Sequence, residues 1–116
     1  MARSDFNWVQ ISHKFTESDP SKTVEFPIEG NLNPVDDAFL LIQIVGVGSY
    51  DHKIFINNKP LPGSDLPIAP GKSGAQQLWM DQIPPGYLMK GTNTIRIDRA
   101  AADDFTVHGA AIHWRE

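Results

Sequence analysis

Hydrophobic and polar positions alternate along several short stretches of the chain, which is the period of a β-strand. In residues 38–47 both alternating sets are apolar: one is Phe39, Leu41, Val45 and Val47, and the other is Ala38, Leu40, Ile42 and Ile44. A strand of this composition is expected in the middle of the fold, buried on both faces. Turn formers follow at residues 48–52 before residues 53–57 alternate again, so we expect a hairpin or a corner between two sheets.

Further stretches alternate in the same way and are expected to be strands. Residues 6–15 place Val9, Ile11, His13 and Phe15 on one side and Phe6, Trp8, Gln10 and Ser12 on the other. Residues 23–28 and 94–99 have their isoleucines and other apolar residues on one side. Residues 105–114 place Phe105, Val107, Gly109, Ala111 and His113 opposite Thr106, His108, Ala110, Ile112 and Trp114.

One stretch, Gln76–Ile83, fits two periods. Its hydrophobic residues match either a helical stripe or an alternating strand, and the strand is favoured because Pro84, Pro85 and Gly86 follow directly. The chain then contains seven or eight short strands and no capped helical run. The pattern predicts an all-β sandwich or barrel, formed as one domain over residues 1–116.

Composition narrows the classes of function. The formal charge is −4 and the ten Lys and Arg residues are scattered, so neither nucleic acid nor an anionic membrane is expected as a partner. The absence of cysteine excludes disulfides, thiol catalysis and cysteine-ligated metals. The first ten residues lack the apolar core of a signal peptide, and no stretch is long enough to span a membrane, so a cytoplasmic location is the default expectation.

The order of segments from Phe39 to the C-terminus resembles a known family. The segments AFLLIQIVGV, KIFINNKPL, YLMKGTNTIRI and DFTVHGAAIHW are similar to successive strands and turns of the galactose-binding-domain-like jelly roll, found in carbohydrate-binding modules. The resemblance implies an antiparallel jelly-roll β-sandwich with a non-catalytic binding or docking role. It also implies turn positions at Asn57, Asn58, Gly91 and Asn93. The acidic calcium ligands of sugar-binding members have no counterpart in residues 6–15.

Three groups of residues have the side chains of reactive sites. The PGKSG segment, residues 70–74, lacks the earlier glycine of a phosphate-binding loop and is expected to be an exposed turn. His108 and His113 are expected on opposite faces of one strand, where they cannot share a metal unless a bulge intervenes. Asp98, Asp103 and Asp104 are expected to begin a turn. We therefore expect no catalytic set, no metal site and no cofactor, and hence no enzyme.

The aromatic residues give the candidate ligand site. Trp79 lies beside the proline-rich residues 60–73, and Gln76, Gln77, Asp81 and Tyr87 are close to it in sequence. These five residues are the predicted ligand-binding site, with the indole stacking on a sugar and the polar groups bonding its hydroxyls. The alternative that Trp79 only packs against the protein stays open. Trp114 is expected in the core.

The expected function is a non-catalytic module that binds carbohydrate. The alternative is a structural or assembly subunit that docks to copies of itself, as a homo-oligomer, or to another protein. Solution mass separates the two, because assembly raises the mass above 12.9 kDa.

Overall fold

The computed structural model describes residues 4–33, 36–47, 52–62, 76–100 and 103–116. Its strands are β1 (Ser4–Phe15), β2 (Ser21–Ile28), β3 (Ala38–Val45), β4 (Lys53–Ile56), β5 (Lys59–Pro60), β6 (Gln76–Ile83), β7 (Gly91–Asp98) and β8 (Phe105–Arg115). They form two antiparallel four-stranded sheets. Sheet A has the order β1-β8-β3-β6, and sheet B has the order β2-β7-β4-β5.

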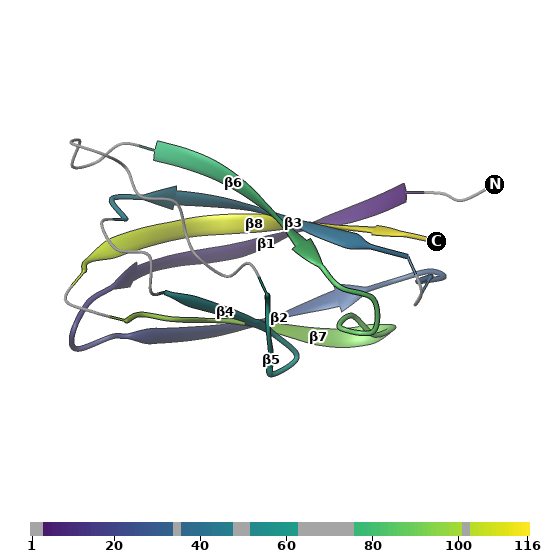
Figure 1. Cartoon of the computed structure of the whole chain (residues 1–116), viewed down its shortest axis with the longest axis horizontal. Coiled ribbons are helices and arrows are strands. Elements are labelled where there is room, and N and C mark those ends of the chain that lie inside the picture. Colours follow the sequence, from purple (N-terminus) through teal and green to yellow (C-terminus); the bar gives the residue numbers. More distant parts are fainter. Residues whose placement is uncertain (1–3, 34–35, 48–51, 63–75, 101–102) are drawn as a thin grey trace.

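The two sheets lie one above the other, as Figure 1 shows, and the predicted antiparallel β-sandwich is confirmed. Every connection crosses from one sheet to the other except the turn between β4 and β5, which agrees with the jelly-roll expectation. The segment Gln76–Ile83 is a strand, as favoured from its sequence. Among the described residues, no helix is long and apolar enough to cross a membrane.

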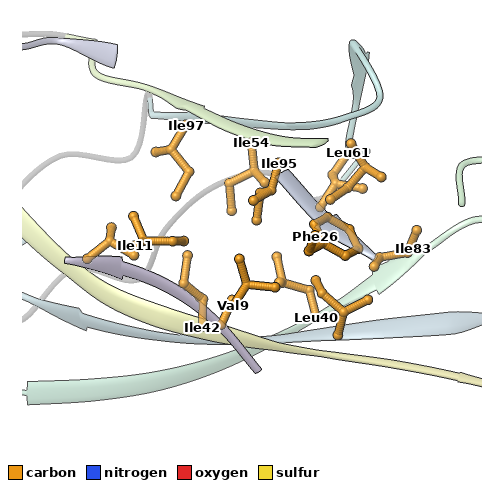
Figure 2. Close-up of a cluster of buried hydrophobic side chains, with 14 of the residues drawn as sticks. Val9, Ile11, Phe26, Leu40, Ile42, Ile54, Leu61, Ile83, Ile95 and Ile97 are labelled. Carbon is orange, nitrogen blue, oxygen red and sulfur yellow. The ribbon is translucent and has the colours of Figure 1, made fainter. Parts of the chain in front are cut away.

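The core lies between the sheets and comes from the inward-facing residues of both. Leu40 and Ile42 project from sheet A toward Ile54, Ile95 and Ile97 of sheet B (Figure 2). All five are 1% exposed or less. Because burial of one aliphatic side chain stabilises the fold by roughly 1.5–3 kcal/mol, this layer supplies much of the driving force for folding.

Asparagines hold the turns at one end of sheet B. Asn57 and Asn58 have φ values of 51° and 65°, as both central residues of a type I′ hairpin turn require. The Asn57 side chain donates to Asn93 Oδ1 (2.8 Å) and accepts from the Thr94 amide (2.9 Å). Asn93 is fully buried and also bonds both backbone groups of Met89, so the expected turn residues act as structural ties.

The expectation that residues 38–47 are buried on both faces is wrong for one face. Leu40, Ile42 and Ile44 are completely buried, whereas Leu41 is 38% exposed and Phe39 is half-buried. The fold has two layers, so nothing in the described chain covers the outer face of sheet A. The alternation in residues 38–47 shows that both faces of the strand are apolar. It does not show whether a third layer of structure covers the outer face.

The predicted alternation of residues 105–114 is also wrong beyond Val107. Gly109 pairs with Gln43, but the next residue of β3, Ile44, pairs with Val107, which leaves His108 as an extra residue in a β-bulge. The bulge shifts the phase of β8 by one position. Its inward-facing residues are therefore Phe105 and Val107 before the bulge and Ala110, Ile112 and Trp114 after it.

Candidate functional site

The outer face of sheet A is apolar across its four strands. Strand pairing places Phe6 beside His113 and Phe39 in one row, and Trp8 beside Ala111, Leu41 and Met80 in the next. Leu78 extends the face on β6. Phe6 is 67% exposed and Met80 63%, and Leu78 and Trp8 are exposed too. Large hydrophobic side chains gathered on one solvent-exposed surface indicate an interaction site rather than a scatter of single residues.

Trp8 is fixed in position on this face. A Cβ built on Gly109 would lie 2.4 Å from the Trp8 ring, so the indole lies directly against the glycine backbone. The indole Nε1 donates to Gln10 Oε1 at 3.1 Å, and the Gln10 amide in turn donates to the Ser12 hydroxyl. The Trp8 ring is therefore held by packing on one side and a hydrogen bond at its edge, with little rotamer freedom left to lose on binding.

A shallow hollow lies in the middle of the face. It is lined by Phe6, Phe39, Leu41, Met80, Ala111 and His113. The floor is low at Ala111, because its methyl side chain stands between the longer side chains of β1, β3 and β6. The lining is almost entirely hydrophobic carbon. Such a hollow fits an apolar side chain and offers a polar ligand very few hydrogen bonds.

Charge is confined to the ends of the face. Lys14 pairs with Thr106 at one end of sheet A, and Arg115 pairs with Ser4 at the other. Between them, the outward-facing residues of the described strands include no Asp, Glu, Lys or Arg. Glutamines at positions 10, 43, 76 and 82, together with His113, supply polar groups. The centre of the face can therefore be removed from water without burying an unpaired charge.

The structure places the predicted ligand residues on two sides of β6 and on a neighbouring loop. Gln77, Trp79 and Asp81 pair with the inward-facing residues of β3 and share one side of the strand, whereas Gln76 lies on the other. Trp79 is 43% exposed. Gln76 and Gln77 line one shallow depression, and Asp81 lines another with Pro62 and Pro84.

Tyr87, the fifth predicted residue, lies between β6 and β7. Its hydroxyl donates to the Pro60 carbonyl (2.8 Å), and Lys59 Nζ lies 5.6 Å from the centre of its ring. Tyr87 is thus held to β5 through both its hydroxyl and its ring. The proline-rich residues beyond Pro62, including the PGKSG segment, lie outside the described residues.

His52 and Asp103 form a partly buried pair that the sequence did not signal, because 51 positions separate them. His52 is completely buried, and its Nε2 lies 2.7 Å from Asp103 Oδ2. Its Nδ1 accepts the Ala100 amide at 3.0 Å, which assigns the ring proton to Nε2. Both ring nitrogens are thereby occupied and shielded from solvent, so the pair ties two loops together and is not placed to act as a base on a substrate.

Asp98 and Asp104, the other two acids of the predicted turn, each lie beside an arginine. Asp104 pairs with Arg99 (3.1 Å), and Asp98 lies 3.3 Å from Arg96. Among the described residues, no group of three His, Cys, Asp or Glu side chains gathers in the manner of a metal site. The geometry thus leaves the outer face of sheet A as the surface with the clearest binding chemistry.

Comparison with known proteins supports the fold and the family. No curated protein matches the chain. A solved structure, dimeric latent PorU from Porphyromonas gingivalis, superposes with a TM-score of 0.74 at 9% identity; the match covers 99% of this chain but only 13% of PorU. At that identity the likeness shows a shared β-rich fold and nothing about activity. Residues 3–116 match the family of unknown function DUF7383, and the chain belongs to that family.

Proposed function

We propose that this protein is a non-catalytic interaction module that docks a protein surface through the outer face of sheet A. One observation carries the proposal: Phe6, Trp8, Leu41, Leu78 and Met80 are all exposed on a single uncharged sheet face. Interface cores are enriched in aromatic residues and methionine and depleted of charge, which is the composition of this face. The resemblance to binding and docking jelly rolls agrees with such a role.

The chemistry of the face favours a protein over a sugar as its ligand. A sugar presents hydroxyl groups that need hydrogen-bond partners, and the hollow around Ala111 is lined almost wholly by carbon. A protein surface can instead bring aliphatic or aromatic side chains. Removing this apolar area from water is favourable by roughly 25 cal/mol for each Å² buried.

The test is site-specific photo-crosslinking in cells that naturally make the protein. A photoreactive residue in place of Met80 lies on the outer face of sheet A, and one in place of Thr23 lies on the exposed outer face of sheet B. We expect a protein adduct from position 80 and none from position 23. Equal adducts from both positions, or none from position 80, would overturn the proposal.

A second candidate is a carbohydrate site on the opposite side of β6, where the predicted ligand residues Gln77, Trp79 and Asp81 lie. One observation favours it: Trp79 is 43% exposed and shares its side of the strand with the polar residues Gln77 and Asp81. An exposed indole beside polar groups is the usual means of holding a sugar ring. The site would be separate from the outer face of sheet A.

Glycan-array binding and tryptophan fluorescence test this second candidate. Trp79→Ala should abolish binding and leave the fold intact, because the indole is far from fully buried. Trp114→Ala is the control for folding: Trp114 is 3% exposed, and its loss should destabilise the protein by about 3–5 kcal/mol. A parent protein that retains no glycan, or a Trp79→Ala variant that unfolds, would rule the carbohydrate site out.

A further inference from the structure

The size of the outer face of sheet A limits what can cover it. Four strands about 4.8 Å apart, with eight residues of about 3.4 Å each in β3, give a face of roughly 500 Å². A single added peptide strand would cover about a quarter of that width. Full coverage needs a partner as broad and flat as a β-sheet.

A second copy of the chain offers a sheet of the same width. Two such faces in contact bury roughly 1,000 Å² in total, which reaches the lower limit for a specific interface. Sheets pack face to face in this way inside every β-sandwich, including this one. The area of the face therefore matches what a two-fold contact between copies requires.

Charge is compatible with contact between copies. Each copy carries a formal charge of −4, so two copies repel each other weakly at a distance. In the strands that the structure describes, the outer face of sheet A carries no acidic side chain, and its cations, Lys14 and Arg115, lie at its two ends. Like charges are therefore not forced together at the centre of the contact, where desolvation would cost most.

The shape of the face, with a projecting side chain next to a hollow, is suited to self-association. Phe6 projects from β1 and is 67% exposed, while the hollow over Ala111 lies beside it in the middle of the same sheet. A two-fold interface uses one patch twice, so a patch needs both a projection and a hollow to fit its own copy. Trp8, already held against Gly109, adds a rigid aromatic surface next to the hollow.

We propose that two copies of this chain pack through the outer faces of sheet A around a two-fold axis, with Phe6 of each copy entering the hollow over Ala111 of the other. The inference rests on the docking function proposed above, and it identifies the docked protein as a second copy of the chain. The contact covers Leu41, Met80 and Trp8 in both copies. It leaves sheet B, the Trp79 side of β6 and the asparagine-tied turns free.

Sedimentation or light scattering over a micromolar concentration series tests the proposal on the full chain. The parent mass should rise from 12.9 kDa to twice that value with concentration. Phe6→Ala removes the projection, and Ala111→Glu puts a charge in the hollow. Each should raise the dimer dissociation constant at least about tenfold. Thr23→Glu adds the same charge to the outer face of sheet B and should leave the constant unchanged.

Each result decides between the two proposals. A parent protein that stays at 12.9 kDa, or a Thr23→Glu variant as impaired as Ala111→Glu, overturns the dimer. If the parent stays monomeric while the crosslinker at position 80 captures a different protein, the docking function stands and only the second copy is wrong. If neither assay detects a partner, both proposals fail. Phe6 is exposed in the monomer, so Phe6→Ala should fold normally, and its denaturation midpoint checks this.

Discussion

The outer faces of the two sheets meet solvent in different ways. On sheet B the aromatic ring of Phe55 is covered, because the Arg96 guanidinium lies 4.1 Å from its centre. Arg96 also donates to Asn58 Oδ1 (3.2 Å) and lies 3.3 Å from Asp98, which accepts from the Ser21 hydroxyl. On sheet A no such charged cover lies over the hydrophobic residues of the described strands.

The difference shows what a solvent-facing sheet needs. Both sheets bury the same kind of inner face, rich in isoleucine, so the core does not distinguish them. Sheet B then turns threonines and charged residues outward, and two of the charged residues, Arg96 and Asp98, have partners within the chain. Sheet A turns outward side chains that would normally be buried. This contrast supports the proposed docking through the outer face of sheet A, whereas the outer face of sheet B is suited to contact with water.

The largest expected effect separates the two faces of sheet A at neighbouring residues of β3. Ile42→Ala should destabilise the protein by about 2–5 kcal/mol, because Ile42 is completely buried and its loss leaves a cavity between the sheets. Leu41→Ala should cost about 1 kcal/mol in the monomer, because the side chain is already 38% exposed and the space left opens to solvent. Urea denaturation at low protein concentration measures both.

The dependence of the stability loss on protein concentration distinguishes Leu41→Ala from Ile42→Ala further. If Leu41 lies in a contact between copies, its loss should cost more at high protein concentration than at low concentration, whereas the cost of Ile42→Ala in the core should not change. Equal losses at both residues would mean that the outer face of sheet A is covered in the monomer, and the contrast between the faces would disappear.

An intermediate effect is expected at Gly109, where the Trp8 indole lies against the backbone of β8. An added methyl group would lie 2.4 Å from the Trp8 ring and 2.8 Å from the Val9 carbonyl oxygen. Gly109→Ala should therefore displace the indole and destabilise the fold by about 1–3 kcal/mol, the usual range for overpacking. Near-ultraviolet circular dichroism measures the environment of the indole, and a denaturation curve measures the free energy of unfolding.

Ala111→Gly serves as the control, because it removes a methyl group from the same face without a clash. An unchanged Trp8 signal in Gly109→Ala would show that the ring is not held against the glycine.

Much of the fold follows from alternation alone. The strands near residues 6–15, 76–83 and 94–99 were predicted from their period of two, and the alternation of residues 6–15 correctly places Val9, Ile11 and Phe15 inside. The period failed in β8, because a bulge at His108 adds one residue without any marked change in hydrophobicity. A local irregularity of backbone pairing depends on the neighbouring strands, which one segment of sequence does not describe.

The candidate site was harder to predict because it depends on layers and not on motifs. Leu41 was predicted to be buried, and Phe6 and Trp8 were assigned only to one side of a strand. The useful signal was present: residues 38–47 have two apolar sides, and residues 6–15 carry Phe6 and Trp8 opposite their core side, which exceeds what a two-layer sandwich can bury. The pairing of His52 with Asp103 left no such signal, since loops bring together residues far apart in sequence.

The smallest expected effect lies on the outer face of sheet B, at Arg96. Arg96→Ala removes the guanidinium over Phe55 and the contact with Asp98, but these groups are about one-third exposed, so the loss should be about 1 kcal/mol or less and smaller still in high salt. Denaturation at low and high salt measures this loss, and Arg96→Met keeps the packing on Phe55 while removing the charge. The mass of the variant should follow concentration as the parent mass does, because the proposed contact uses sheet A alone. A large loss of stability would show that the charged cover of sheet B is a major structural element, and a changed mass would show that both outer faces take part in association.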